Sequence, residues 1–251
     1  MRILSFSTHK GGTGKTTSSI NLAAKLGREG HRTLLIDMDP QGHATLGVGL
    51  DLAYDEPNIA DVLTDRGVPL GEIIRPTDIP NLMIAPSNIR LASVAESLYA
   101  KMRREERLQK NLTAFQEPFE WVVIDCPPAL GILTANALEA SEIILIPCQM
   151  GARALDGLGD LLDVVRVLKE EDFTDWWIVL TMFDPRKKVT QEIFETLLTP
   201  YRDKVLHTQI FATEALNQAQ MARQDIFTFD PKGRGTRDYE ALAQEVLQRY
   251  P

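Results

Sequence analysis

The chain has 251 residues, of which 44% are hydrophobic and 25% are charged, as in a soluble globular protein with a substantial core. No stretch approaches the roughly 20 continuous apolar residues of a membrane span, and the N-terminus does not resemble a signal peptide. The net charge of −8 argues against a protein that is uniformly attracted to DNA. Residues 184–251 hold ten basic and ten acidic side chains. Any basic face must therefore be assembled locally, and this last part of the chain is where it could form.

Strand and helix patterns alternate along the chain. Strands are predicted at 2–7, 33–36, 82–85, 121–124, 142–146, 177–181 and 205–209. Helices are predicted at 16–28, 89–114, 131–140, 155–169, 187–198, 213–223 and 236–249. This alternation predicts an α/β fold with one doubly wound, mostly parallel sheet and helices on both faces. Because no repeat or low-complexity linker interrupts it, we expect residues 1–251 to form a single domain.

Two further segments carry less specific signals. Residues 51–81 are rich in proline and glycine and read as an irregular elaboration with one short helix, Asn58–Leu63. Within the predicted helix 89–114, residues 101–107 form a dense charge run. This run is typical of a solvated helix face with pairs four residues apart, and a partner-protein surface is the alternative.

The first predicted strand runs into a glycine-rich loop that opens a helix, an arrangement that binds phosphate chains. The glycines let successive N–H groups point at one anion, and the helix directs its positive end toward it. We assign the nucleotide contacts to Lys10, Gly11, Gly12, Thr13, Gly14, Lys15, Thr16 and Thr17. Lys15 would reach the β- and γ-phosphates, and the Thr16 hydroxyl is placed to ligate Mg²⁺.

The loop departs from the general pattern G-x-x-x-x-G-K-[ST] at its first position. His9 stands where the first glycine would be, and a second lysine, Lys10, precedes Lys15 by five residues. Two lysines in one loop repel each other unless a polyanion neutralises both. A solvated surface lysine is the alternative interpretation of Lys10.

Aspartates follow two further buried-strand patterns. Asp37 and Asp39 come at the end of one, and Asp125 comes at the end of another. Since ligands of open parallel sheets bind beyond the carboxyl ends of the strands, we expect Lys15 to meet Asp39 and Asp125. Taken singly, each aspartate could equally cap its loop.

With these segments, the chain resembles the ParA/MinD group of ATPases with a deviant Walker A loop, and within it the Soj-like ParA partition proteins. The motifs that carry the resemblance read K-G-G-T-G-K-T-T at 10–17, D-M-D-P-Q-G at 37–42 and D-C-P-P-A-L-G-I-L-T-A-N-A-L at 125–138. Moderately specific matches continue to F-D-P-K-G-R-G at 229–235, so the resemblance covers nearly the whole chain.

The resemblance implies a slow ATPase with ATP and Mg²⁺ that dimerises around the nucleotide. Lys10 matches the signature lysine that reaches the partner's phosphates, so Lys10, Lys15 and Asp39 would be catalytic, with Asp39 positioning the attacking water. Thr16, Asp37 and Asp125 would hold the metal or its waters. We also assign Met182 and Phe211 to the nucleotide site.

A cytoplasmic, nucleoid-associated switch also needs partners: nonspecific double-stranded DNA and a ParB-like or other adaptor that stimulates hydrolysis. Basic residues at a turn and at a helix N-terminal region suit phosphate contacts without base readout. We assign DNA binding to Arg186, Lys187, Lys188, Lys232, Arg234 and Arg237. Solvated charge is the alternative for these side chains.

The chain departs from its family in two places. Soj-like proteins usually read I-P-R-N-V-R where residues 210–215 here read I-F-A-T-E-A, so two arginines are absent. A divergent member that positions a plasmid or a protein cargo therefore fits as well as a chromosomal one. The C-terminus lacks the lysine-rich amphipathic helix of MinD-type proteins, so no membrane binding is expected.

A metabolic or redox enzyme on the same fold is the competing function. A relative of the nitrogenase iron protein would need interface cysteines for a cluster, and the setting of Cys126 and Cys148 in apolar strand patterns instead suits reduced core residues of a cytoplasmic protein. An enzyme resembling dethiobiotin synthetase would need a substrate pocket, for which the sequence offers no constellation.

Overall fold

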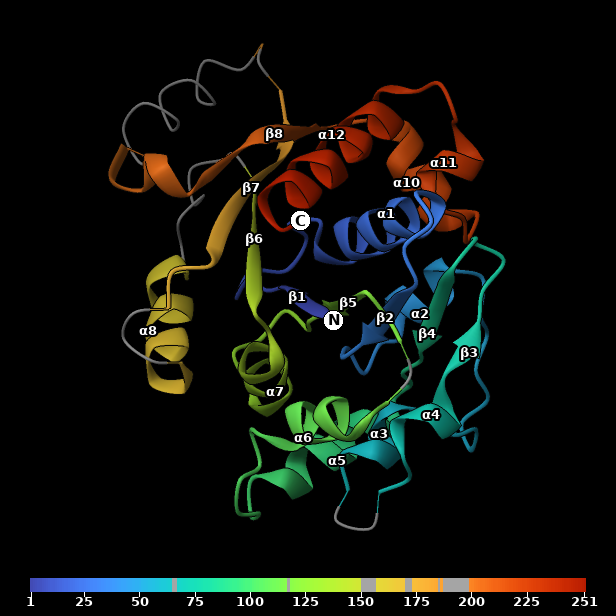
Figure 1. Ribbon diagram of the computed structural model, residues 1–251, viewed down its shortest axis with the longest axis vertical. Coiled ribbons are helices and arrows are strands. Elements are labelled where there is room, and N and C mark those ends of the chain that lie inside the picture. The colour runs from blue at the N-terminus through green and yellow to red at the C-terminus, as the bar shows by residue number, and fades with distance from the viewer. Residues whose placement is uncertain (65–66, 117, 150–156, 170–172, 185, 187–198) are drawn as a thin grey trace.

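The computed structural model describes residues 1–251 except 65–66, 117, 150–156, 170–172, 185 and 187–198 (Figure 1). Its described strands form an eight-stranded sheet in the order β3-β4-β2-β5-β1-β6-β7-β8. The strands are β1 (Arg2–Phe6), β2 (Thr33–Asp37), β3 (Arg75–Pro76), β4 (Leu82–Ala85), β5 (Trp121–Asp125), β6 (Ile143–Gln149), β7 (Trp176–Phe183) and β8 (Val205–Phe211).

Every strand pairing is parallel except that of β3 with β4. All residues of β2 and β5 are buried, which explains why these strands read as continuous apolar runs rather than as alternating patterns. The seven predicted strands are confirmed. Strand β3 was not predicted, because it has only two residues and contains Pro76, which an edge position tolerates.

Helices pack on both faces of the sheet, as predicted (Figure 1). The helices are α1 (Lys15–Arg28), α2 (His43–Gly47), α3 (Ile59–Val62), α4 (Leu70–Ile73), α5 (Arg90–Leu98), α6 (Arg107–Ala114), α7 (Ile132–Ala140), α8 (Leu158–Leu168), α10 (Glu214–Met221), α11 (Ile226–Phe229) and α12 (Arg234–Arg249). A 3₁₀ segment covers Thr199–Lys204. Apolar side chains of α1, α2, α10, α11 and α12 bury one face, and those of α3 to α8 bury the other.

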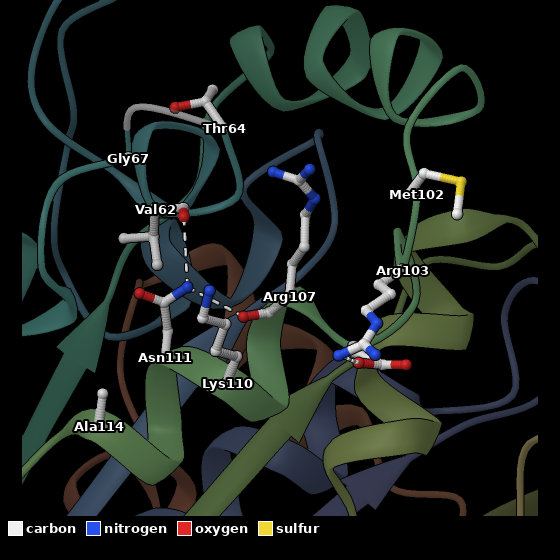
Figure 2. Close-up of a pocket in the computed structure, with 10 residues that line it drawn as sticks. Val62, Thr64, Gly67, Met102, Arg103, Arg107, Lys110, Asn111 and Ala114 are labelled. Carbon is white, nitrogen blue, oxygen red and sulfur yellow. Dashed lines mark hydrogen bonds and ion pairs between the residues drawn. The ribbon is translucent and has the colours of Figure 1, made fainter.

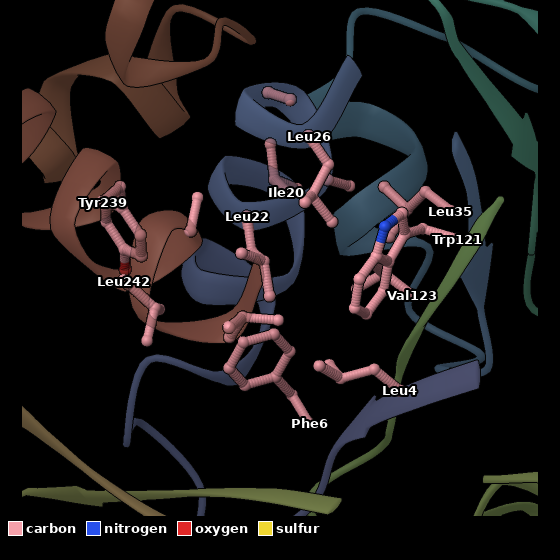
Figure 3. Close-up of a cluster of buried hydrophobic side chains, with 14 of the residues drawn as sticks. Leu4, Phe6, Ile20, Leu22, Leu26, Leu35, Trp121, Val123, Tyr239 and Leu242 are labelled. Atoms are coloured by element: carbon pink, nitrogen blue, oxygen red, sulfur yellow. The ribbon is translucent and has the colours of Figure 1, made fainter. Parts of the chain in front are cut away.

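The core beneath α1 and α12 holds the central strands in place. Leu22 and Leu26 of α1 are fully buried in one cluster with Phe6 of β1 and Leu242 of α12 (Figure 3). Burying one such side chain contributes about 1.5–3 kcal/mol, so this cluster fixes α1, and with it the loop that precedes α1, against the sheet.

The prediction of one continuous helix over 89–114 is wrong. Helix α5 ends at Leu98, residues 99–106 form turns, and Arg103 has a left-handed φ of 49°. Tertiary contacts hold this break: the Tyr99 hydroxyl accepts the N–H of Ile132, and the Arg104 carbonyl accepts from the Asn136 amide. These partners lie about 30 residues away, so local periodicity could not report them.

The charge run therefore lies mainly in a turn and not on a helix face. Its ion pairs join Arg103 to Glu106 and Arg104 to Glu105, each at 3.9 Å. Beside it lies a cavity of about 440 Å³ between α6 and the residues that follow α3, with Met102 and Lys110 in its lining (Figure 2). The partner-surface interpretation of this run stays a hypothesis.

The other predicted helices match in position where the structure describes them. Helix 187–198 lies outside the described residues, and so do residues 155–156 at the start of the prediction for α8. Helices α2, α4 and α11, which have four or five residues each, were not predicted. Over the part of the chain that is described, the helices are too short or too polar to span a membrane.

Candidate functional site

The loop between β1 and α1 turns tightly, so that its last residues contact its first ones. Gly12 and Gly14 have φ values of 71° and 88°, a left-handed conformation that favours glycine. The Lys15 ammonium turns back and donates to the Lys10 carbonyl at 3.0 Å. The Thr181 hydroxyl of β7 donates to the Thr13 carbonyl at 2.8 Å, which ties the loop to the sheet. The result is a glycine-containing loop, tied to the sheet, at the start of a 14-residue helix, an arrangement that suits an anion.

Lys15 is buried at this helix start. Burial lowers the pKa of its ammonium, and the nearby charges of Asp125 and Asp39 oppose that effect. The structure thus brings Lys15 within electrostatic reach of aspartates that follow two other strands. A buried cation beside the exposed glycines Gly11 and Gly12 suits a multiply charged anion.

Asp125, the last residue of β5, is fully buried and held by two hydroxyl groups of α1. Thr16 donates to its Oδ2 at 2.8 Å, and Ser19 donates to its Oδ1 at 3.0 Å. Ser19 lies one turn after Thr16, so both reach the same carboxylate. The sequence reading missed Ser19, although its spacing from Thr16 carried the signal.

Asp37, the last residue of β2, orders the segment that follows it. It accepts the N–H of Asp39 at 3.0 Å, and the N–H and the hydroxyl of Thr45 at 2.8 Å each. Asp39 in turn accepts the N–H of Gln41 at 2.9 Å. Thr45 was not singled out in the sequence, since nothing in the pattern shows that the short helix α2 turns back onto β2.

The two strand-end carboxylates lie on neighbouring strands in the same register. Burial, opposed by the hydrogen bonds from Thr45, raises the pKa of Asp37 to about 6. Burial and then the charge of Asp37 raise the pKa of Asp125 to about 8. Two buried carboxylates repel each other when both are ionised. Binding of a cation at this site is therefore favourable, because it stabilises the ionised form of both.

Hydroxyl and carboxylate oxygens are the ligands that Mg²⁺ prefers, and Mg²⁺ keeps several of its waters. Among the described residues no three His, Cys, Asp or Glu side chains are grouped so as to ligate a metal directly. The three residues therefore fit a Mg²⁺ ion whose other coordination positions are filled by a bound anion and by water molecules. They are Thr16, Asp37 and Asp125. Cys126 and Cys148 are both buried, as expected for core residues.

Lys10 lies half-buried at the outer side of the loop. Its charge acts on the buried thiol of Cys148 at the end of β6, whose pKa burial nevertheless raises to about 11. Within the described ranges of the chain, the Lys10 ammonium makes no ion pair. A half-buried ammonium without a carboxylate partner is suited to an incoming polyanion.

A cavity of about 440 Å³ opens beside the loop. Gly14 and Thr17 line it from α1 and the loop, and Met182 and Phe211 line it from the ends of β7 and β8. Met182 has a φ of 50°, where β7 and β8 shift register. Such irregularities re-aim a side chain at functional edges of sheets. The structure thus brings together four of the residues assigned to the nucleotide.

The basic residues assigned to DNA are placed differently from one another. Arg186 is highly exposed, and its guanidinium makes a two-point ion pair with Asp184, at 2.9 and 3.1 Å. Lys187 and Lys188 lie outside the described residues. Lys232 and Arg237 are exposed. Arg234 pairs with Asp238 at 2.7 Å and covers the ring of Phe211.

Comparison with known proteins adds an independent line of information. The family model described as "AAA domain" matches residues 1–176. The chain is 40% identical over 248 residues to the sporulation initiation inhibitor protein Soj of Bacillus subtilis, covering 98% of both chains. It is 35% identical over 252 residues to the chromosome partitioning protein ParA of Myxococcus xanthus, covering 99% of this chain and 88% of that protein.

Among solved structures, the chain is similar to cobyrinic acid a,c-diamide synthase from Mycobacterium smegmatis with bound ATP analog and magnesium. The TM-score is 0.84 and the identity 27%, over 100% of this chain and 96% of that one. The sheet order, the loop geometry and these likenesses over almost the full length agree. The chain belongs to the Soj/ParA family of P-loop ATPases.

Proposed function

We propose that this protein is an ATP-dependent switch: it binds ATP with Mg²⁺, dimerises around the nucleotide and hydrolyses it slowly. The observation that carries this proposal is the convergence of Lys15, Thr16 and three strand-end aspartates at one helix start. The M. smegmatis neighbour is described with an ATP analog and magnesium at 27% identity, which supports the same ligands here.

The residues divide the work as follows. Gly11 to Thr17 surround the phosphates, and Lys15 neutralises their charge. Thr16, with Asp37 and Asp125 acting through water, would hold Mg²⁺, which supplies charge neutralisation between the phosphate oxygens. Met182 and Phe211 hold the base.

Hydrolysis requires a positioned water rather than covalent help from the protein. Asp39 is buried beside Lys15, and its carboxylate is oriented by the Gln41 N–H, so it is suited to align that water. Lys10 would reach the phosphates of a second copy. A lysine supplied by the partner makes tight binding and catalysis depend on dimerisation, which is what a switch needs.

We further propose that the dimer binds duplex DNA nonspecifically and positions DNA or a protein cargo, with an adaptor that triggers hydrolysis. Support comes from the partition role named for the M. xanthus relative and from the exposed cations Arg186, Lys232 and Arg237. Lys187 and Lys188 extend the same basic stretch in the sequence.

The competing function is a biosynthetic enzyme, and it is favoured by the synthase name of the M. smegmatis neighbour. The two functions separate in one experiment, light scattering of the purified protein with and without ATP and Mg²⁺, paired with phosphate release. A switch changes from monomer to dimer with ATP and turns over slowly without any second substrate. A protein that stays monomeric with ATP, or that hydrolyses it only with an added small-molecule acid, would overturn the proposal.

A further inference from the structure

Helix α12 is attached to strand β8 near both of its ends by the same kind of unit. A carboxylate on α12 accepts backbone N–H groups of β8, and an arginine one turn away pairs with that carboxylate and covers an aromatic ring. At the first end, Asp238 accepts the N–H of Phe211 at 2.9 Å and the Nε–H of Arg234 at 2.7 Å. The guanidinium carbon of Arg234 lies 3.6 Å from the centre of the Phe211 ring.

At the second end, Glu245 accepts the N–H groups of His207 and Thr208 at 2.9 and 2.8 Å. Arg249 pairs with Glu245 at 3.4 Å, and its guanidinium carbon lies 3.9 Å from the centre of a Trp177 ring. Each unit thus docks the helix on the sheet with a stacked arginine, and each stabilises the fold.

Only the first unit touches the candidate base pocket. Phe211 lines the cavity beside the phosphate loop, and so does Tyr239, the neighbour of Asp238 on α12. The Phe211 ring is held on two sides, because Phe183 meets it edge-on with ring centres 5.2 Å apart. Trp177 and Arg249 are absent from the lining of this cavity.

We propose that Arg234 is a positioning residue of the base pocket, which fixes the Phe211 ring and backbone before the nucleotide arrives. This inference rests on the proposed nucleotide binding and gives Arg234 a different role from the expected DNA contact. Because the Phe211 ring is already ordered, it loses no rotamer freedom when the base binds. The affinity of the protein for ATP is therefore higher. A flat guanidinium can both stack on the ring and donate to Asp238, whereas a lysine ammonium cannot do so.

The test compares Arg234→Lys with Arg249→Lys, since both changes keep the charge and remove a stacked guanidinium from α12. Calorimetry measures the affinity of each protein for ATP and for inorganic tripolyphosphate, which has the phosphates and no base. Arg234→Lys should weaken ATP about threefold to thirtyfold and leave tripolyphosphate unchanged. Arg249→Lys should leave the ratio of the two affinities at the wild-type value, even where its melting temperature falls.

Arg234→Gln, which is shorter and neutral, provides a second variant and should give the same selective loss. For both variants the KM for ATP should rise while kcat at saturating ATP stays unchanged. An unchanged affinity ratio in the Arg234 variants, or an equal change in Arg249→Lys, would overturn the inference. A wild-type protein that binds no ATP would instead remove the proposed function, so the two failures are distinguishable.

Discussion

Asp37 and Asp125 are aligned side by side at the carboxyl ends of β2 and β5, and both carboxyl groups are fully buried. Among the described residues, neither has a cation as a hydrogen-bond partner, and Thr45, Thr16 and Ser19 supply their side-chain donors. Two buried acids in this arrangement make the protein without metal sensitive to pH.

The pKa of Asp125 is raised to about 8, so its proton is held more tightly in the folded chain than in the unfolded one. A raised carboxyl pKa stabilises the folded state in full at pH values below the pKa of the unfolded chain, which is about 4. This stabilisation is lost as the pH rises through the pKa of the folded chain. In EDTA, Asp125→Asn should therefore gain stability relative to the wild type between pH 4 and 8. Urea unfolding at several pH values measures the difference, and a difference independent of pH would contradict the prediction.

Lys15→Ala should abolish nucleotide binding, because the loop then lacks its buried counter-charge. Lys10→Ala should keep binding to the monomer and lose the dimer that ATP induces. Titration with a fluorescent ATP analogue reports binding, and light scattering reports the dimer. Dimerisation of Lys10→Ala at the wild-type ATP concentration would show that Lys10 does not act on a partner's phosphates.

Asp39→Ala should bind ATP and accumulate as a dimer but hydrolyse it very slowly. Loss of the group that orients the water typically costs about 10²–10⁴ in rate. Single-turnover phosphate release measures the chemical step directly, with Glu29→Ala, at an exposed acid directly after α1, as the control. A normal rate in Asp39→Ala would remove this carboxylate from the mechanism.

Binding to DNA should be independent of sequence, dependent on ATP and strongly weakened by salt, because phosphate contacts release counterions. Arg186→Glu should weaken binding to every duplex alike and lower the salt slope by about one, with ATP hydrolysis intact. Arg166→Glu on α8 makes the same charge change at an arginine that also pairs with an aspartate, Asp163, three residues away. Equal losses of DNA affinity in the two variants would indicate a general effect of charge and would contradict a specific DNA-binding face.

Gly27 lies in the last turn of α1, where the backbone of Pro80 and Asn81 approaches it. A Cβ at this position would lie 2.4 Å from the Pro80 carbonyl oxygen. Alanine usually stabilises a helix relative to glycine by up to about 1 kcal/mol, but Gly27→Ala should destabilise the protein by about 1–3 kcal/mol through overpacking. Gly159→Ala on α8 is the control, because nothing lies within 4 Å of its Cβ. Thermal unfolding compares the two, and equal melting temperatures would contradict the clash.

Much of the candidate site could be predicted from local pattern. The spacing of glycines, a lysine and a threonine after an apolar strand predicts a phosphate loop. The structure has that strand, loop and helix, and two of the loop glycines have a positive φ. The seven strands were also predictable, because buried parallel strands are short continuous apolar runs. Asp39 and Asp125 were expected to lie near Lys15 because parallel strands end at the same edge of the sheet.

What only the tertiary structure decided depends on contacts between residues far apart in sequence. Ser18 of α1 hydrogen-bonds Tyr239 of α12, the Thr181 hydroxyl holds Thr13, and Asn136 interrupts the helix expected over 89–114. The role proposed here for Arg234 depends on contacts of the same kind. Sequence reports it as a cation near a helix start, whereas folding places Asp238 and Phe211 against it. Charge can be counted along a chain, but whether a charged group stays available is decided by the partners that packing brings to it.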